Sequence, residues 1–269
     1  MESGQGQGQR SKRRWSREEI YKAVSSKVGK GVEVPIELCF YNPREVYEGL
    51  RSNLEVKRWL EYIADEYQPT RSFKVLLLYP CSTIKPYPKS FFYKQLFKTL
   101  SELGEDRGQV HLVTVSEPFG LVPEEFYGKK TEVHDWENRW YDCPGLFEWW
   151  CSQYGQPFEK LYLHESIRIL ATYVSRFLKR SYEAGWYAYR IAFVRTFSSK
   201  LREKDDHTHV KIVRLASKLS GVPVEILPSK EMVEKIVREI GEYAWNRCGV
   251  RHPYAQQLLL DYLKSIIRP

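Results

Sequence analysis

The stretch VLLLYPCSTIKPYPKSFFYKQLF, residues 75–97, decides the fold. It begins with an unbroken apolar run, which is typical of a strand buried on both faces of a sheet. It ends with apolar side chains at helical spacing, the pattern of an amphipathic helix. A polar segment with two prolines, residues 80–87, joins the two parts. This order of strand, polar segment and helix predicts part of an α/β fold.

Three more runs of apolar, β-branched or aromatic residues follow, each separated from the next by helical pattern. The four expected strands are residues 74–79, 110–115, 190–194 and 222–227. Unbroken apolar strands that alternate with helices favour a parallel sheet covered on both faces. We therefore expect a three-layer α/β fold with a short, four-stranded, mostly parallel sheet.

The part of the chain that precedes the first strand has a different character. Residues 1–14 are rich in Gly and Gln and then basic, which predicts a disordered tail, residues 15–70 a helical N-terminal extension, and residues 71–269 the α/β domain with C-terminal helices. Helix starts are expected at the capping residues Ser16, Asn42 and Asn53. The tail either contacts phosphates or only adds solubility, and its candidate nucleic-acid-binding residues are Arg10, Lys12, Arg13 and Arg14.

The charge of the chain favours an anionic partner such as nucleic acid. There are 42 Lys and Arg residues against 34 Asp and Glu, a net charge of +8. A solvated basic surface would give the same balance, so both interpretations stay open.

The cysteines indicate a reducing environment. There are five, an odd set without a Cys-x-x-Cys pair or a recognisable signal peptide ahead of them. The sequence also has no apolar run of about 18 residues that would cross a membrane. A cytoplasmic protein without a disulfide framework and without membrane contact is expected.

Polar residues follow each of the four expected strands. The segments are residues 80–90, 116–120, 196–199 and 228–230, and the second begins with Ser116 and Glu117. Ligands of an open parallel sheet bind beyond the carboxyl ends of its strands. The sequence therefore predicts the functional site at this edge.

Cys81 and Lys85 are the candidates for chemistry in the first of these segments. Cys81 directly follows a strand and precedes a helix, and the helix dipole and Lys85 would both favour its thiolate. A buried Cys also packs as a small hydrophobe, which is the alternative. Lys85 is expected at the mouth of the site or in solvent, where it would hold an anion. Hydroxyl donors for the same anion, or caps of the following helix, are Ser82, Thr83 and Ser90.

Residues 134–155 are rich in aromatic side chains, which either stack a nucleobase or line a second core. Asp142 lies there in a Pro/Gly turn and is expected to be exposed. No metal and no cofactor is expected, since the spacings of His134, Cys143, Cys151 and His164 match no compact zinc pattern. The pair His207 and His209 is interpreted as polar residues that begin a helix.

The stretch PCSTIKPYPKSFFY, residues 80–93, resembles the PC-x3-KPY-x2-S-x2-H motif of archaeosine synthase, an archaeal tRNA-modification enzyme related to tRNA-guanine transglycosylase. Six positions match, and Tyr93 stands where the motif has His. Residues 53–69 and 110–126 and the Tyr-Asp-x-Pro segment at 141–144 are also similar to that family. The resemblance extends over residues 53–240 and implies a domain related in fold to uracil-DNA glycosylases. The matching motif positions are Pro80, Cys81, Lys85, Pro86, Tyr87 and Ser90.

The resemblance implies a transferase. Archaeosine synthase adds the amine of free lysine to the nitrile of a 7-cyano-7-deazaguanine base in tRNA, and a radical enzyme partner then cleaves the adduct. By this likeness Cys81 is the candidate thiolate and Asp142 the holder of the incoming ammonium, with Lys85 and Ser90 as further catalytic candidates. The substrate-binding candidates are Pro80, Ser82, Thr83, Tyr87, Tyr93, Ser116, Glu117 and Tyr141.

No transglycosylase-like barrel is recognised in the chain, so tRNA is expected to contact its basic helices or a transglycosylase-like subunit.

Two other functions stay open. An unperturbed Tyr has a pKa of about 10, so Tyr93 in place of His also fits a non-catalytic tRNA-binding or partner subunit of a modification complex. A nucleic-acid glycosylase is less well supported, because such enzymes carry a His after the fourth strand, where this chain has Pro228 and Ser229.

Overall fold

A computed structural model describes residues 13–24, 34–127, 143, 146, 148–203 and 207–268. Its centre is a five-stranded mixed sheet in the order β3-β2-β1-β4-β5. Neighbouring strands are parallel throughout, except that β3 runs antiparallel to β2. The strands are β1 (Phe73–Pro80), β2 (Val110–Ser116), β3 (Gly120–Pro123), β4 (Tyr187–Phe193) and β5 (Glu225–Leu227).

The prediction of an α/β fold is confirmed, but the predicted number of four strands was wrong. The additional strand, β3, covers the segment GLVP, which has four residues and ends in proline. Gly120, with φ +63°, closes the turn from β2, and Leu121 then pairs with Val115. A proline that cannot donate to a neighbouring strand is tolerated at a sheet edge, and this is where β3 lies.

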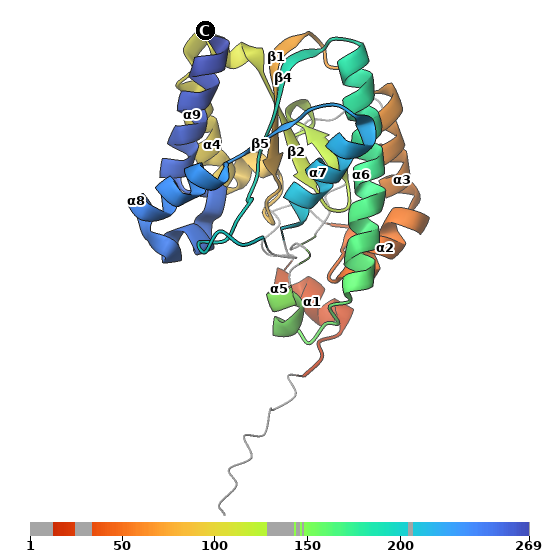
Figure 1. The fold of residues 1–269 in the computed structure, drawn as a ribbon. Helices are drawn as coiled ribbons and strands as arrows, with labels where there is room; N and C mark the ends of the chain where they lie inside the picture. The colour runs from red at the N-terminus through yellow and green to blue at the C-terminus, as the bar shows by residue number, and fades with distance from the viewer. Residues whose placement is uncertain are drawn as a thin grey trace, which may run out of the picture.

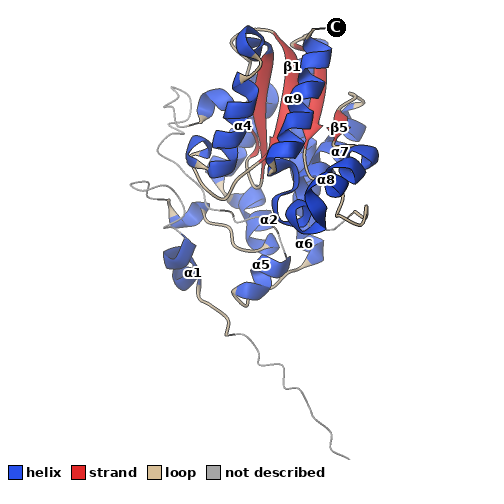
Figure 2. Cartoon of the chain, turned by 90° about the vertical axis from the view of Figure 1, so that its left-hand side faces the viewer, coloured by secondary structure: helices blue, strands red, loops and turns tan. Residues whose placement is uncertain are grey.

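Helices cover both faces of the sheet (Figures 1 and 2). On one face α4 and α8 both contact α9, and on the other α6 contacts both α2 and α7. Helices α1 and α5 lie beyond one end of the sheet. The helices are α1 (Arg17–Val24), α2 (Pro43–Ser52), α3 (Leu54–Glu61), α4 (Phe91–Ser101), α5 (Glu148–Gln153), α6 (Lys160–Glu183), α7 (Thr208–Ser220), α8 (Lys230–Cys248) and α9 (Pro253–Ile267). None of the helices in the described ranges has the combination of length and apolar character that a membrane crossing requires.

The predicted capping residues begin their helices. Ser16 and Glu19 form a reciprocal capping box before α1, since each side chain bonds the backbone amide of the other. The Asn42 side chain accepts from the amide of Glu45, and the Asn53 side chain accepts from two amides of α3. Each of these capping partners lies within three residues of the capping side chain.

Trp59 links α3 to the sheet edge. Its side chain is buried, and Nε1 donates to the carbonyl oxygens of Phe119 and Leu121, each at 3.1 Å. The ring also makes an edge contact with Phe126 at 5.1 Å between centroids. Helix α3 therefore shares the core of the sheet. The division into an extension and a domain at residues 70 and 71 stays a prediction.

Replacing Gly49 by alanine is expected to destabilise the protein by about 1–3 kcal/mol through overpacking. A Cβ at this position of α2 would lie 2.3 Å from Cε1 of the buried Phe40 ring. On an exposed helix the same change would stabilise by about 1 kcal/mol, so the sign of the effect reports the contact. Urea unfolding measures it, with the exposed Glu48→Ala in the same helix as the matched control. A Gly49→Ala protein as stable as the wild type would contradict the close packing.

Candidate functional site

The candidate site lies where the strand order reverses. Strands β2 and β4 flank β1 on opposite sides, and α4 follows β1 on one face of the sheet while α7 follows β4 on the other. Such a switch point opens a crevice beyond the carboxyl ends of the strands. These ends face downward in Figure 1, toward α1 and α5. The predicted location of the site is therefore supported by the topology.

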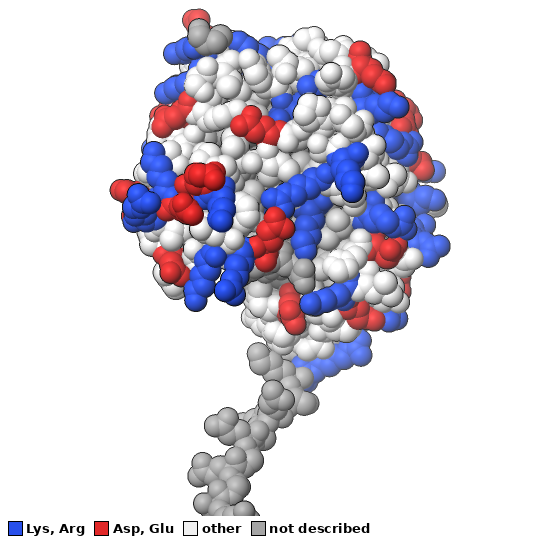
Figure 3. Space-filling view, in the orientation of Figure 1, with Lys and Arg blue, Asp and Glu red and all other residues white. Residues whose placement is uncertain are grey.

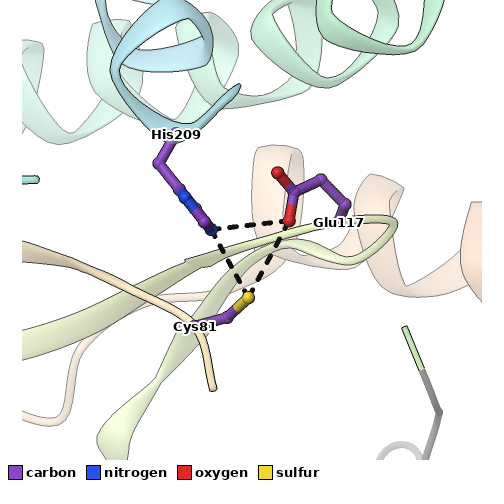
Figure 4. Close-up of side chains that lie close together, drawn as sticks. All are labelled: Cys81, Glu117 and His209. Carbon is purple, nitrogen blue, oxygen red and sulfur yellow. Dashed lines mark hydrogen bonds and ion pairs between the residues drawn. The ribbon is translucent and has the colours of Figure 1, made fainter. Parts of the chain in front are cut away.

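Three chemically reactive side chains meet at this edge (Figure 4). Cys81 Sγ lies 3.4 Å from His209 Nε2 and 3.8 Å from Glu117 Oε2. The third side of the triangle, from His209 Nε2 to Glu117 Oε2, is 3.4 Å. Cys81 and Glu117 are buried, and the His209 side chain is 14% exposed. A thiol, a carboxylate and an imidazole thus share one small space with limited access to solvent.

Each member of the triangle is held by the fold. Cys81 directly follows β1, and its amide donates to the carbonyl of Val115 in β2. Glu117 directly follows β2, and its Oε1 accepts from the hydroxyl of Thr208. Thr208 and His209 are the first two residues of α7. The start of one helix therefore positions both the imidazole and the carboxylate beside the thiol.

The electrostatics of the triangle favour a charged imidazole. Burial disfavours the imidazolium, but attraction to Glu117 and Cys81 and the hydrogen bond to Cys81 outweigh it and raise the pKa of His209 above its ordinary value. A cationic imidazole beside a sulfur atom can donate a proton to the group that the sulfur attacks. The arrangement can therefore supply a nucleophile and a proton donor. It differs from a linear catalytic triad, in which the acid binds the other ring nitrogen, because both partners face Nε2.

A cavity of about 330 Å³ adjoins the triangle. Its wall contains His209 and the residue before Cys81, and it is otherwise rich in arginine. Such a wall suits an anionic or polar ligand. Trp149, which is 60% exposed, offers an aromatic face at the same cavity. The lining includes Pro80, Trp149, Arg195, His209, Arg247 and Arg251.

The segment between β1 and α4 forms an internal network. Ser82 Oγ donates to Ser90 Oγ at 2.9 Å and accepts from the amide of Ile84 at 3.3 Å. Ser90 is the residue before α4, but its side chain makes no capping hydrogen bond, so the capping alternative was wrong for Ser90. Lys85 is 1% exposed, which excludes the solvent-facing alternative for its ammonium. Among Ser82, Thr83, Lys85 and Ser90, only Thr83 is exposed.

Tyr93 contacts the start of the segment between β1 and α4. Its hydroxyl donates to the carbonyl of Pro80 at 3.1 Å and is also hydrogen-bonded to Thr114 Oγ1 at 2.5 Å. The ring stacks on Tyr87, with centroids 4.9 Å apart. Burial raises the pKa of Tyr93 well above its ordinary value, so the hydroxyl stays neutral. In this position Tyr93 fixes the backbone that precedes Cys81.

Tyr93→Phe is expected to destabilise the protein by about 1–3 kcal/mol, because two buried hydrogen-bond partners lose the hydroxyl. Urea unfolding measures this loss. Tyr182→Phe on α6 removes the hydroxyl of a ring that is 54% exposed and should change the stability by less than about 0.5 kcal/mol. Equal stability of Tyr93→Phe and the wild type would show that these hydrogen bonds add nothing.

The remaining predicted residues are distributed as follows. Ser116 is buried at the end of β2, where its hydroxyl donates to the Glu117 carbonyl at 3.3 Å. Arg13 and Arg14 are exposed, and Arg13 pairs with Glu19. Outside the described residues lie Tyr141, Asp142, Arg10, Lys12 and His134.

His209 was missed as a functional residue. It does begin a helix, as interpreted, but it also points at Cys81, which is 128 residues away in sequence. Its position in the first turn of α7, the helix that follows β4, was the only available signal, and it did not show where the side chain points. Among the described residues, the triangle is the one group of three or more His, Cys, Asp or Glu side chains close enough to share a metal ion, and it does not include Cys143, Cys151 or His164.

The fold and the triangle together define an α/β protein with a cysteine-centred site at the switch point of its sheet. Residues 56–137 match the model of a family described as "Domain of unknown function (DUF5591)". The chain is 29% identical to archaeosine synthase subunit alpha of Thermococcus kodakarensis over 168 residues, which are 62% of this chain and 23% of that protein.

Two further relatives carry the same name. Archaeosine synthase subunit alpha of Methanosarcina acetivorans is 39% identical over 74 residues, 28% of this chain and 11% of that protein. Its counterpart in Thermoplasma acidophilum is 31% identical over 93 residues, 35% of this chain and 16% of that protein. The matches thus span less than a quarter of these relatives. They confirm the resemblance to archaeosine synthase.

No solved structure matches the chain. The relation in fold to uracil-DNA glycosylases therefore stays a prediction.

Proposed function

We propose that this protein acts in tRNA modification as a transferase of the archaeosine synthase type. Its substrate would be a 7-cyano-7-deazaguanine base in tRNA, and its second substrate free lysine. The observation that carries the proposal is the meeting of Cys81, Glu117 and His209 beside the cavity. The names of the relatives supply the substrate class, and the triangle supplies the chemistry.

The proposed reaction has two steps. In the first, the thiolate of Cys81 adds to the nitrile carbon, one C–N π bond breaks, and the nitrogen takes a proton from the His209 imidazolium. The product is a thioimidate. In the second, the amine of lysine adds to the same carbon, the electrons of the remaining C–N π bond move onto nitrogen, and the amine loses a proton to His209. The C–N π bond then re-forms as the C–S bond breaks, which leaves an amidine on the base and returns the Cys81 thiolate beside the His209 imidazolium.

The surroundings of Cys81 support this assignment. Glu117 stabilises the imidazolium that the first step needs, because its Oε2 lies 3.4 Å from Nε2. We assign to the buried Lys85 and to Ser82 and Ser90 the task of shaping and polarising the nitrile pocket. Asp142 is proposed to hold the ammonium of lysine.

The charge distribution supports an RNA partner. Arg195, Arg247 and Arg251 line the cavity, where guanidinium groups would contact phosphates next to the modified base. Lys and Arg side chains are spread over the face of the molecule in Figure 3, with acidic side chains between them. We infer that tRNA binds across this edge of the sheet, and that a transglycosylase-like subunit and a radical enzyme complete the modification.

The test is a reaction of the purified protein with lysine and tRNA that carries the nitrile base, followed by mass spectrometry of the nucleosides. The proposal predicts a gain equal to the mass of lysine, since the addition loses no atoms. A complete absence of this product, with candidate partner subunits present, would contradict it. Omission of lysine is the control.

A second candidate, a non-catalytic tRNA-binding subunit, rests on one specific observation. Tyr93 occupies the His position of the archaeosine synthase motif, and here it is buried and hydrogen-bonded to Pro80 and Thr114. Salt-sensitive binding of the tRNA without any mass gain would favour this candidate.

A further inference from the structure

The triangle has the dimensions of a tetrahedral zinc site. Zinc lies about 2.3 Å from a thiolate, about 2.0–2.1 Å from an imidazole and about 2.0–2.2 Å from a carboxylate. With tetrahedral angles these bonds place the ligand atoms about 3.3–3.6 Å apart. The three separations observed are 3.4, 3.4 and 3.8 Å. The ligand atoms would therefore need to move by only a few tenths of an ångström.

The chemistry of the three ligands selects the class of metal. A thiolate and an imidazole prefer Zn²⁺ or Co²⁺ to Mg²⁺ or Ca²⁺, which take oxygen ligands. On metal binding the Cys81 thiolate and the Glu117 carboxylate would bring two negative charges into a buried space, and a divalent cation balances both.

The surroundings orient the ligands as an outer shell does in zinc proteins. The Thr208 hydroxyl donates to Oε1 of Glu117 and thereby leaves Oε2 directed at the other two ligand atoms. The guanidinium of Arg251 donates to the Cys81 carbonyl at 2.5 Å and fixes the backbone of the thiol. Partners of this kind hold ligands in place before the metal arrives.

We propose that Cys81, Glu117 and His209 bind one Zn²⁺ ion and leave its fourth position open to the cavity. Structural zinc sites are closed by four protein ligands, whereas a site with three leaves one position accessible to water or a small ligand. His209 lines the cavity, so water or a small ligand can reach that position. Coordination releases to solvent the proton that Cys81 and His209 share, and it occupies a lone pair of the sulfur. The metal-bound protein therefore cannot use Cys81 as a free nucleophile, and zinc inhibits the proposed transferase.

The test is a titration of the metal-free protein of residues 1–269 with Co²⁺, followed by competition with Zn²⁺. A thiolate-to-cobalt charge-transfer absorption at one ion per chain, with d–d bands of four-coordinate intensity, is the expected result. Cys81→Ser should abolish the charge-transfer absorption, and Thr208→Val should weaken binding about 10–100-fold as the loss of an outer-shell partner. Cys248→Ser, which changes a partly exposed thiol at the end of α8, is the matched control and should keep the absorption.

A second measurement separates the metal site from the proposed reaction, because it uses no tRNA. Saturating Zn²⁺ should slow the alkylation of Cys81 by iodoacetamide at least about tenfold, whereas Mg²⁺ should not. Circular dichroism and thermal unfolding verify that each variant is folded. An absorption that persists in folded Cys81→Ser, or no binding at all by the wild type, would overturn the metal site. Lysine transfer that is merely absent would contradict the proposed function alone.

Discussion

Cys81→Ala is expected to abolish lysine transfer to the nitrile base, with a loss of more than about 10³-fold in kcat, as for the removal of other catalytic nucleophiles. In the proposed reaction the Cys81 sulfur forms the bond to the nitrile carbon, and no other member of the triangle is assigned that step. Cys81→Ser should be equally inactive, because a hydroxyl is far less acidic than a thiol and forms too little of the nucleophilic anion.

Two further measurements sharpen this prediction. Without lysine, the wild type should form an adduct with the tRNA that survives denaturation, and Cys81→Ala should not. Cys151→Ala is the matched control: Cys151 belongs to a separate cluster around Trp150, and burial raises the pKa of its thiol to about 12. This variant should keep wild-type activity. Substantial turnover by Cys81→Ala would refute the thioimidate route.

His209→Gln is expected to lower kcat about 10²–10⁴-fold, the usual contribution of a general acid–base catalyst. Glutamine can still donate a hydrogen bond to Cys81 but cannot transfer a proton at neutral pH. The variant should also react more slowly with iodoacetamide, because the imidazolium that stabilises the thiolate is lost. Stopped assays for transfer and mass spectrometry for alkylation measure the two effects.

His164→Gln on the surface of α6 is the matched control for the histidine change, and no effect is expected. Wild-type transfer by folded His209→Gln would exclude the imidazole from the reaction. A loss of transfer with unchanged alkylation would instead assign His209 to proton transfer alone, without a role in the ionisation of Cys81.

Local patterns predicted much of the fold. The four expected strands and the capping residues Asn42 and Asn53 are encoded by neighbours a few positions away, and all are present, although β4 begins three residues earlier and β5 three residues later than expected. The edge strand β3 was not predicted, because its four residues carry no periodicity of their own. It pairs with β2 across the turn at Gly120. A segment of four residues becomes a strand by pairing with a neighbouring strand, here β2. Its own sequence pattern does not show that such a neighbour exists.

Part of the candidate site could likewise be predicted from the sequence, and part of it could not. Cys81 and Glu117 could be predicted because the carboxyl ends of parallel strands are where ligands bind, and both residues directly follow strands. His209 could not, because its role depends on the direction in which α7 approaches the sheet. The burial of Lys85 was not predicted from the sequence for a related reason, since only the packed structure shows how deeply the segment after β1 is buried.

The hydrogen bond from Arg251 to the Cys81 carbonyl shows that the candidate site includes residues from distant parts of the chain. The segment matched by the family model, residues 56–137, contributes the thiol and the carboxylate. The imidazole at 209 and the guanidinium at 251 come from beyond it. The candidate site is therefore larger than the segment that the family model matches. A protein that shares only the matched segment would carry the thiol and the carboxylate without the imidazole and the guanidinium that contact the cysteine.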